Sequence, residues 1–202
     1  MYLSRCYNSA NSKKKVSNRP LVCVVIVNLL LYNYHKMKKI LLLPILFFAM
    51  ISCTQAQETA FTADALNAKM KTLEGKEIAF KDILAQYKGK TVVIDVWASW
   101  CPDCIKGMPK VHELQKQFPN VVYLFLSYDR FDDKWKQGIE KYKVVGDNYH
   151  VGTSMKEGAF AKEIKLDWIP RYMVVDKTGK IALFKAIEAD DAKLTETLKN
   201  LK

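Results

Sequence analysis

Two cysteines three residues apart, Cys101 and Cys104, have the most specific chemical potential in the sequence. The β-branched apolar run that ends at Trp97 predicts a buried strand, and a helical pattern begins at Pro102. Cys101 is therefore expected at the N-terminus of a helix, where the positive end of the helix dipole favours a thiolate. Cys104 lies one helical turn further on and can attack a mixed disulfide formed at Cys101. This spacing predicts a dithiol pair for disulfide exchange, with Cys101 as the nucleophile.

A lone Cys-x-x-Cys pair has two other interpretations, which are half of a zinc site and a structural bridge. Zinc sites usually have about four ligands, often from a second cysteine pair. After residue 53, the cysteines of the sequence are Cys101 and Cys104, and its histidines are His112 and His150. Because this ligand set is poor for zinc, no metal site is predicted. A bridge inside this part of the chain must join Cys101 to Cys104.

The residues around this motif alternate between strand and helix patterns. Apolar β-branched runs predict strands, which we expect over residues 91–97, 121–127, 172–176 and 181–185. Apolar residues at helical spacing predict helices, which we expect over residues 102–118, 132–142, 157–164 and 190–201. Asp190 or Asp191 lies near the N-cap of the last helix. This order predicts an α/β fold with a central mixed β-sheet flanked by helices.

The segment before this domain has the pattern of an export signal. A short basic start at Met37 precedes an apolar run from Ile40 to Ile51. This pattern is typical of a signal peptide, here over residues 37–52. The run is shorter than the roughly 20 apolar residues that a bilayer-spanning helix needs. The sequence therefore predicts an exported protein.

The residues next to the signal predict how the protein is held after export. Cys53 follows small and apolar residues in a pattern that resembles the lipidation site of bacterial lipoproteins. The alternative is ordinary cleavage after Ala56. We expect residues 53–60 to form a polar tether, and a folded domain over residues 61–202. Residues 1–36 precede the signal and are predicted to be a non-native upstream extension.

The net charge of +11 is concentrated at the N-terminal end of the sequence. Residues 1–52 contain lysines and arginines but no acidic residue, and they account for +8 of this total. The remaining residues 53–202 are nearly balanced, at +3. A balanced domain lacks the basic surface that phosphate backbones require. We therefore expect no nucleic-acid partner.

Residues 92–104 read Val-Val-Ile-Asp-Val-Trp-Ala-Ser-Trp-Cys-Pro-Asp-Cys and resemble the active-site segment of thioredoxins. They are most similar to the exported thiol:disulfide oxidoreductases of the TlpA/ResA type. The similarity covers about residues 61–202 and includes a Leu-Glu-Gly-Lys-Glu hairpin at 73–77 and the Ile169-Pro170 step before a strand. The resemblance implies a thioredoxin-like fold with an N-terminal β-hairpin extension.

The resemblance also implies roles for residues far from the cysteines. Pro170 matches the cis-proline that faces the active-site disulfide, where it and Ile169 present backbone to a substrate. The alternative is an ordinary trans proline in a turn. Asp95 matches the buried acid that assists proton transfer from the second cysteine. A carboxylate on a buried strand has a raised pKa, which suits a general base. The alternative is an acid at a strand edge, paired with Lys90 or another lysine.

Residues close to the cysteines complete the predicted site. Trp97 and Trp100 match the aromatic residues that flank the motif, which cover the disulfide and form an apolar docking surface for substrate. The other interpretation is packing in the core, and the two interpretations are compatible. Pro102 and Asp103 lie between the cysteines, and Asp103 departs from thioredoxins, which have proline there. Its charge stabilises the helix N-terminus but opposes a thiolate on the first cysteine. Arg171 could offset this charge or attract acidic partners.

These residues predict a thiol:disulfide oxidoreductase that acts as a reductant on the periplasmic side, lipid-anchored through Cys53. Its redox-active disulfide needs no metal or organic cofactor. The expected partners are client proteins with thiols or disulfides, including apocytochromes c, and a membrane electron donor. One alternative is a thiol peroxidase, although Ala98 stands where peroxiredoxins have threonine. The other is a lipoprotein whose thioredoxin-like domain is a binding module with a structural disulfide.

Overall fold

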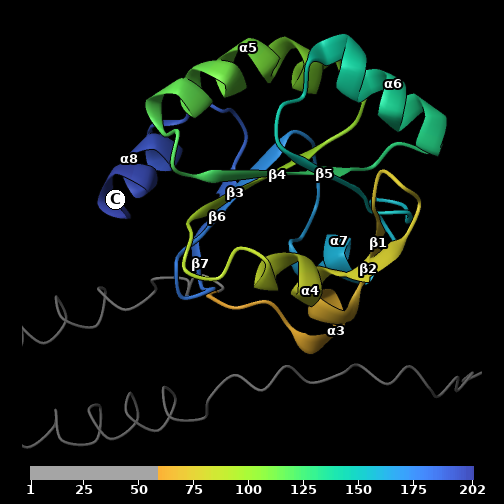
Figure 1. Cartoon of the computed structure of the whole chain (residues 1–202), viewed down its shortest axis with the longest axis horizontal. Coiled ribbons are helices and arrows are strands. Elements are labelled where there is room, and N and C mark those ends of the chain that lie inside the picture. Colours follow the sequence, from red (N-terminus) through yellow and green to blue (C-terminus); the bar gives the residue numbers. More distant parts are fainter. Residues whose placement is uncertain (1–58) are drawn as a thin grey trace, which may run out of the picture. The chain divides into compact units, whose positions relative to one another are not determined.

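The computed structural model describes residues 59–202, which form a seven-stranded sheet with helices on both faces (Figure 1). The sheet has the strand order β2-β1-β5-β4-β3-β6-β7. Its strands are β1 (Lys69–Lys71), β2 (Glu77–Ala79), β3 (Val92–Trp97), β4 (Val122–Ser127), β5 (Asp147–His150), β6 (Arg171–Val175) and β7 (Ile181–Ala186). The helices are α3 (Ala63–Asn67), α4 (Phe80–Ala85), α5 (Pro102–Gln117), α6 (Asp132–Tyr142), α7 (Ala159–Glu163) and α8 (Ala192–Asn200).

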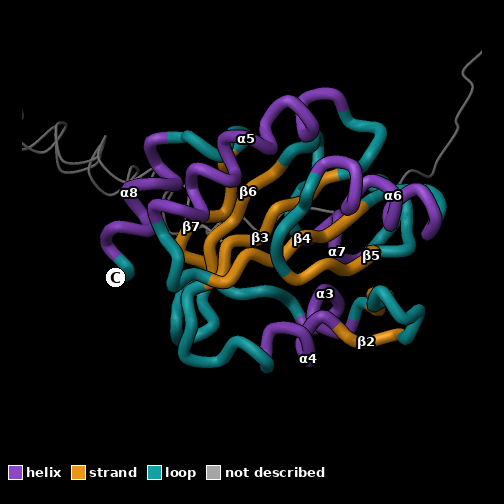
Figure 2. Tube along the Cα trace, turned by 45° about the horizontal axis from the view of Figure 1, so that its top comes forward, coloured by secondary structure: helices purple, strands orange, loops and turns teal. Residues whose placement is uncertain are grey.

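Strand β3 lies inside the sheet and leads directly to the cysteine motif. It pairs in parallel with β4 and antiparallel with β6, so the sheet is mixed as predicted. Helices α5 and α6 cover one face of the sheet, while α3, α4 and α7 lie on the opposite face (Figures 1 and 2). All six residues of β3 are buried, because both of its faces are covered. This explains why the strand is apolar at every position except Asp95 and does not alternate between apolar and polar residues.

The N-terminal hairpin extends the sheet at one edge. Strands β1 and β2 pair antiparallel, and β1 joins the rest of the sheet through Lys71 and its partner His150 on β5. This confirms the hairpin extension predicted from residues 73–77. Gly75, in the turn between the two strands, has a φ of 81°, a conformation that glycine adopts more readily than other residues.

The elements near the motif agree closely with the sequence pattern. The predicted strands and helices are present, and the main difference is that α7 is shorter than the predicted helix over 157–164. Asp191 caps α8 by accepting a hydrogen bond from the Lys193 N–H at 2.7 Å. The sequence pattern missed β5, α3 and α4. These elements have six residues or fewer, which is too short for a clear periodicity.

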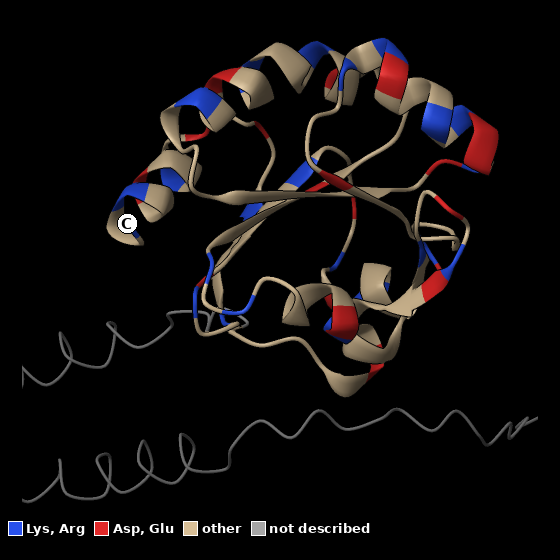
Figure 3. Cartoon of the chain, in the orientation of Figure 1, with Lys and Arg blue, Asp and Glu red and all other residues tan. Residues whose placement is uncertain are grey.

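Several predictions concern residues that precede the described range 59–202. The upstream extension over 1–36, the signal peptide over 37–52 and the lipidation site at Cys53 lie outside them, as does most of the tether over 53–60. Between residues 59 and 202, no helix is both long enough and apolar enough to cross a bilayer. Acidic and basic side chains are mixed along α5, α6 and α8 (Figure 3), in keeping with the nearly balanced charge of this part of the chain.

Candidate active site

The cysteine pair lies at the start of α5, where the sheet ends. Cys101 is the N-cap residue of this helix, and its sulfur accepts a hydrogen bond from the Cys104 N–H at 3.1 Å. Pro102 occupies the first turn, where its missing N–H leaves no hydrogen bond unmade. The two sulfurs form a disulfide, and their Cα atoms lie 5.3 Å apart. Both cysteines are buried, with 3% and 1% of their surface exposed. A thiolate formed at Cys101 would face the positive end of the α5 dipole.

The loop before β6 lies against the disulfide. The peptide bond between Ile169 and Pro170 is cis, the geometry expected from the resemblance. The carbonyl oxygen of Ile169 lies 3.6 Å from the sulfur of Cys101. Both loop residues are buried. Backbone from a segment about 70 positions away in the sequence therefore borders the first cysteine, where an attacking sulfur must approach.

Asp95 is a buried acid on β3, the strand that leads to the cysteine motif. It is 2% exposed on β3, and neither of its carboxylate oxygens has a hydrogen-bond partner of standard geometry among the described residues. Burial raises the pKa of Asp95 to about 8, while the nearby hydroxyl of Tyr172 lowers it in part. The alternative of a strand-edge acid paired with Lys90 does not fit, because Asp95 lies within the sheet and Lys90 is exposed. The carboxyl can therefore take up and release a proton near neutral pH.

The two tryptophans of the motif have different environments. Trp100 is 56% exposed beside the cysteines and is available to a docking protein. Trp97 is fully buried, and its ring would lie 3.3 Å from a Cβ atom placed on Gly138 of α6. Its side chain points from β3 into the layer under α6, so the predicted docking role is wrong for Trp97. Of the two interpretations made for this residue, core packing is the one that the structure supports.

A buried carboxylate that the sequence analysis missed holds the loop before the cysteines. Asp129 accepts hydrogen bonds from the Ser99 N–H at 3.0 Å and from the Ser99 hydroxyl at 2.6 Å. It also accepts one from the Ser127 hydroxyl at 2.8 Å. Ser99 lies two residues before Cys101, so these contacts fix the path by which β3 enters α5. An aspartate just after a buried strand was a usable signal, but its partner lies 30 residues away.

Arg171 has a structural role that differs from the predicted one. It is 1% exposed and donates a hydrogen bond to the Ile164 carbonyl at 2.7 Å. It also forms an ion pair with Asp167. These contacts hold the loop that precedes Pro170, so Arg171 neither offsets the charge of Asp103 nor reaches acidic partners on the surface.

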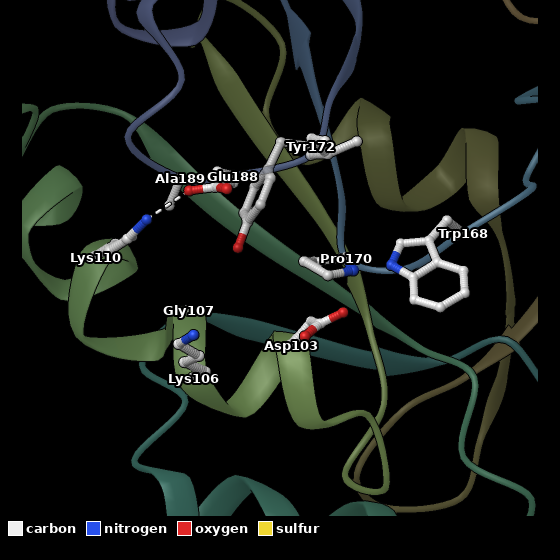
Figure 4. A pocket seen from close by; sticks show the side chains of 10 residues that line it. Asp103, Lys106, Gly107, Lys110, Trp168, Pro170, Tyr172, Glu188 and Ala189 are labelled. Carbon is white, nitrogen blue, oxygen red and sulfur yellow. Dashed lines mark hydrogen bonds and ion pairs between the residues drawn. The ribbon is translucent and has the colours of Figure 1, made fainter.

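A cleft of about 250 Å³ opens between the first turns of α5 and the cis-proline loop (Figure 4). Its walls come from α5, from the cis-proline loop and from the segment between β7 and α8, and its lining residues include Asp103, Lys106, Lys110, Trp168, Tyr172 and Glu188. The ammonium group of Lys110 forms ion pairs with Glu188 and Asp190, which join α5 to the segment after β7. Trp168 and Ile187 are 60% and 50% exposed at the rim. The structure thus adds an open, partly apolar recess that the sequence analysis did not predict.

No group of three or more histidine, cysteine, aspartate or glutamate side chains within residues 59–202 is arranged to hold a metal ion. The chemistry that the site offers comes from the sulfurs of Cys101 and Cys104, and the buried carboxyl of Asp95 is a candidate base. The fold and site together define a thioredoxin-like protein with a Cys-x-x-Cys disulfide at a helix N-terminus.

Comparisons with known proteins support this class and narrow it. Residues 89–181 match the family model described as thioredoxin-like. The chain is 30% identical over 140 residues to the thiol-disulfide oxidoreductase ResA of Bacillus cereus, a match covering 68% of this chain and 76% of that protein. It is 26% identical over 178 residues to the thiol:disulfide interchange protein DsbE of Haemophilus influenzae, covering 81% of this chain and 94% of that protein.

A solved structure leads to the same conclusion. The solution structure of a thiol-disulfide oxidoreductase from Bacteroides vulgatus has a TM-score of 0.57 and 28% identity, and the match covers 69% of this chain and 89% of that one. The chain belongs to the TlpA/ResA-type family of thioredoxin-like thiol-disulfide oxidoreductases. The predicted fold, family and enzyme class are therefore confirmed.

Proposed function

We propose that this oxidoreductase is exported, attached to a membrane by a lipid on Cys53, and reduces disulfides in client proteins through Cys101 and Cys104. The observation that carries the proposal is the placement of Cys101, which caps α5 and lies 3.6 Å from the Ile169 carbonyl. A client strand passing that loop brings its own sulfur to the first cysteine. Exported proteins with cysteine pairs are the proposed clients, apocytochromes c among them. A membrane protein supplies the electrons, and no metal or organic cofactor takes part.

The reaction transfers two electrons to the client. The thiolate of Cys101 attacks one sulfur of the client disulfide, so that a mixed disulfide forms and the other client sulfur leaves as a thiolate. Asp95 then accepts the proton of the Cys104 thiol, and the Cys104 sulfur attacks Cys101. The Cys101–Cys104 bond forms, the bond to the client breaks, and the second client thiolate takes its proton from water. The client is reduced, and the enzyme holds the disulfide until its donor reduces it.

The direction of electron flow follows from how strongly the reduced form is stabilised. A cysteine pair is a strong oxidant when its thiolate is strongly stabilised, because the reduced form is then favoured. Here the negative charge of Asp103 in the first turn of α5 opposes the helix dipole at Cys101. Weaker stabilisation of the thiolate shifts the pair toward reductants. We expect a reduction potential nearer to that of thioredoxin than to that of the strong oxidants.

Trapping of the mixed disulfide tests the proposal. In cells that express the full chain with Cys104→Ser, client proteins should remain bound to Cys101 and should be released by dithiothreitol. The matched control is Cys101→Ser, which keeps one thiol at the site but lacks the nucleophile and should trap nothing. If neither variant captures clients, the exchange function is wrong and a binding module with a structural disulfide becomes the better description.

Two further measurements test direction and attachment. Equilibration of the purified protein with glutathione and dithiothreitol buffers gives its reduction potential, and a value near that of the strong oxidants would reverse the proposed direction. Membrane fractionation of the full chain and of Cys53→Ala tests the lipid anchor. The unaltered protein should sediment with membranes, and the variant should not. Equal sedimentation of both forms would refute attachment through Cys53.

A further inference from the structure

The burial of Asp95 limits its exchange of protons with solvent. It is 2% exposed, so water does not reach its carboxyl freely. Because burial raises its pKa to about 8, the carboxyl is largely protonated at neutral pH. It must lose this proton to water before it can accept one from Cys104, and it must do so again in every cycle. The site therefore needs a route for protons between Asp95 and solvent.

Tyr172 lies where such a route would run. It is directly opposite Asp95 in the antiparallel pair of β6 and β3, and opposite residues in such a pair have side chains on the same face of the sheet. The hydroxyl oxygen of Tyr172 would lie 3.8 Å from a Cβ atom placed on Gly107, so this face is the one under α5. Cys104 lies on α5 one turn before Gly107. Asp95, Tyr172 and the second cysteine thus share one layer of the protein.

The same tyrosine also borders the cleft. Its side chain is 1% exposed and contributes to the lining, and Figure 4 shows the hydroxyl directed toward the space between α5 and Pro170. Asp95 and Tyr172 are direct neighbours across the two strands, although no hydrogen bond of standard geometry joins their side chains. Proton transfer can pass through one bridging water, so it does not require a direct hydrogen bond between the two groups. The hydroxyl of Tyr172 therefore lies between the carboxyl of Asp95 and the water that fills the cleft.

We propose that the hydroxyl of Tyr172 relays protons between the buried carboxyl of Asp95 and water in the cleft beside α5. The inference rests on the proposed function, in which Asp95 accepts the proton of Cys104. It assigns a role in the exchange reaction to Tyr172, which lies outside the cysteine motif and was not among the predicted site residues. Tyr172 is a positioning and relay residue, because it acts on the sulfurs through Asp95.

The relay moves protons without leaving a net charge on the tyrosine. The Asp95 carboxyl gives its proton to the phenol oxygen as the phenol gives its own proton to a water molecule in the cleft. The Asp95 carboxylate then accepts the proton of the Cys104 thiol, and the relay later returns that proton to water. The tyrosine is unchanged at the end and carries no net charge in between. Burial and the nearby carboxyl hold the pKa of Tyr172 well above its ordinary value, so the phenol does not ionise by itself.

The other ionisable groups around the cleft are less suited to this step. Helix α5 provides Asp103, Lys106 and Lys110, and the segment after β7 provides Glu188 and Asp190. Lys110 is held in ion pairs with both acids of that segment. Among the residues that line the cleft, Tyr172 lies directly opposite Asp95 in the pairing of β6 with β3. The charged groups border the water of the cleft, and the tyrosine connects that water to the acid.

The test separates the two steps of exchange. Reduced full-length protein is mixed rapidly with an aromatic disulfide whose thiolates absorb light, so that the first release reports attack by Cys101 and the second reports resolution by Cys104. In Tyr172→Phe, the first rate should stay within about twofold, and the second should fall at least about tenfold at pH 6. The loss should shrink at pH 9, because Asp95 is then already ionised and needs no relay before it accepts a proton.

The matched control is Tyr123→Phe. This tyrosine is also buried, and its hydroxyl donates to the carbonyl oxygen of Leu114 at 3.0 Å, away from the cleft. It should lower stability without changing how the second rate depends on pH. A loss in Tyr172→Phe that is equal at pH 6 and pH 9, or no loss at all, would overturn the relay. If the unaltered protein releases no thiolate, it is instead the proposed function that fails.

A second measurement covers the case in which Tyr172→Phe does not fold. Infrared difference spectra of the unaltered protein can follow the Asp95 carboxyl, assigned with Asp95→Asn, while the solvent is exchanged for deuterium oxide. A relay through Tyr172 predicts exchange at the carboxyl much faster than global unfolding. Exchange that occurs only as the protein unfolds would refute an open proton route.

Discussion

Replacing Asp95 with asparagine should stabilise the folded protein at neutral pH while it impairs resolution by Cys104. The pKa of this carboxyl rises from its ordinary value of 3.8 to about 8 because it is buried. Between those pH values the folded protein keeps the proton and the unfolded chain has lost it. The stability contributed by the protonated carboxyl is therefore complete below about pH 4 and is lost as the pH rises toward 8.

The size of the effect follows from proton linkage. A pKa difference of one corresponds to about 1.4 kcal/mol, so the unaltered protein should lose about 2.5 kcal/mol of unfolding free energy through this group between pH 5 and pH 7. Asparagine does not titrate and should lack this part of the pH dependence. The comparison between two pH values also removes the cost of burying the asparagine amide, because that cost is the same at both.

Guanidinium unfolding of the oxidised proteins, followed by tryptophan fluorescence, measures the difference. The stability of Asp95→Asn relative to the unaltered protein should increase by about 2.5 kcal/mol from pH 5 to pH 7. The matched control is Asp103→Asn. Asp103 is an exposed residue in the first turn of α5, so this substitution also removes one carboxylate, but not from a buried position. If the relative stability of Asp95→Asn is the same at both pH values, the folded protein does not hold Asp95 in its protonated form.

Three other substitutions test the packing and surface of the site. Gly138→Ala should destabilise the protein by about 1–3 kcal/mol in chemical unfolding, because the added Cβ atom would lie 2.5 Å from the Cβ of Ser99. Asp129→Ala should lower the unfolding free energy by about 1–3 kcal/mol, since it removes the acceptor for the Ser99 N–H, and hydrogen exchange at that amide should accelerate. Trp100→Ala should change stability by less than about 0.5 kcal/mol and should reduce kcat/KM for a protein client by about tenfold. An unchanged kcat/KM would remove Trp100 from the docking surface.

The parts of the site that are local in sequence could be predicted from it. The buried strand before the motif, the helix that starts at Pro102 and the nucleophilic position of Cys101 all follow from patterns within about 15 residues. The apolar run around Asp95 also predicts that this acid is buried, but the structure is needed to exclude a position at the edge of the sheet. These predictions depend on short stretches whose physical properties do not need the rest of the fold.

Contacts between distant segments could not be predicted in the same way. Tyr172 meets Asp95 through the pairing of β6 with β3, which depends on how the whole sheet is ordered. Asp129 reaches Ser99 across 30 residues. The two motif tryptophans illustrate the same limit, since their different exposures depend on α6, which packs over one and leaves the other uncovered.

The hairpin of β1 and β2 protects the protein from aggregation at one edge of its sheet. Without it, the open backbone of β5 would form one edge of the sheet, and exposed strand edges can pair with other molecules and aggregate. The hairpin replaces this edge with β2, a strand of three residues with the exposed charge of Glu77. A chain shortened past residue 79 should therefore self-associate, even though it would retain both cysteines.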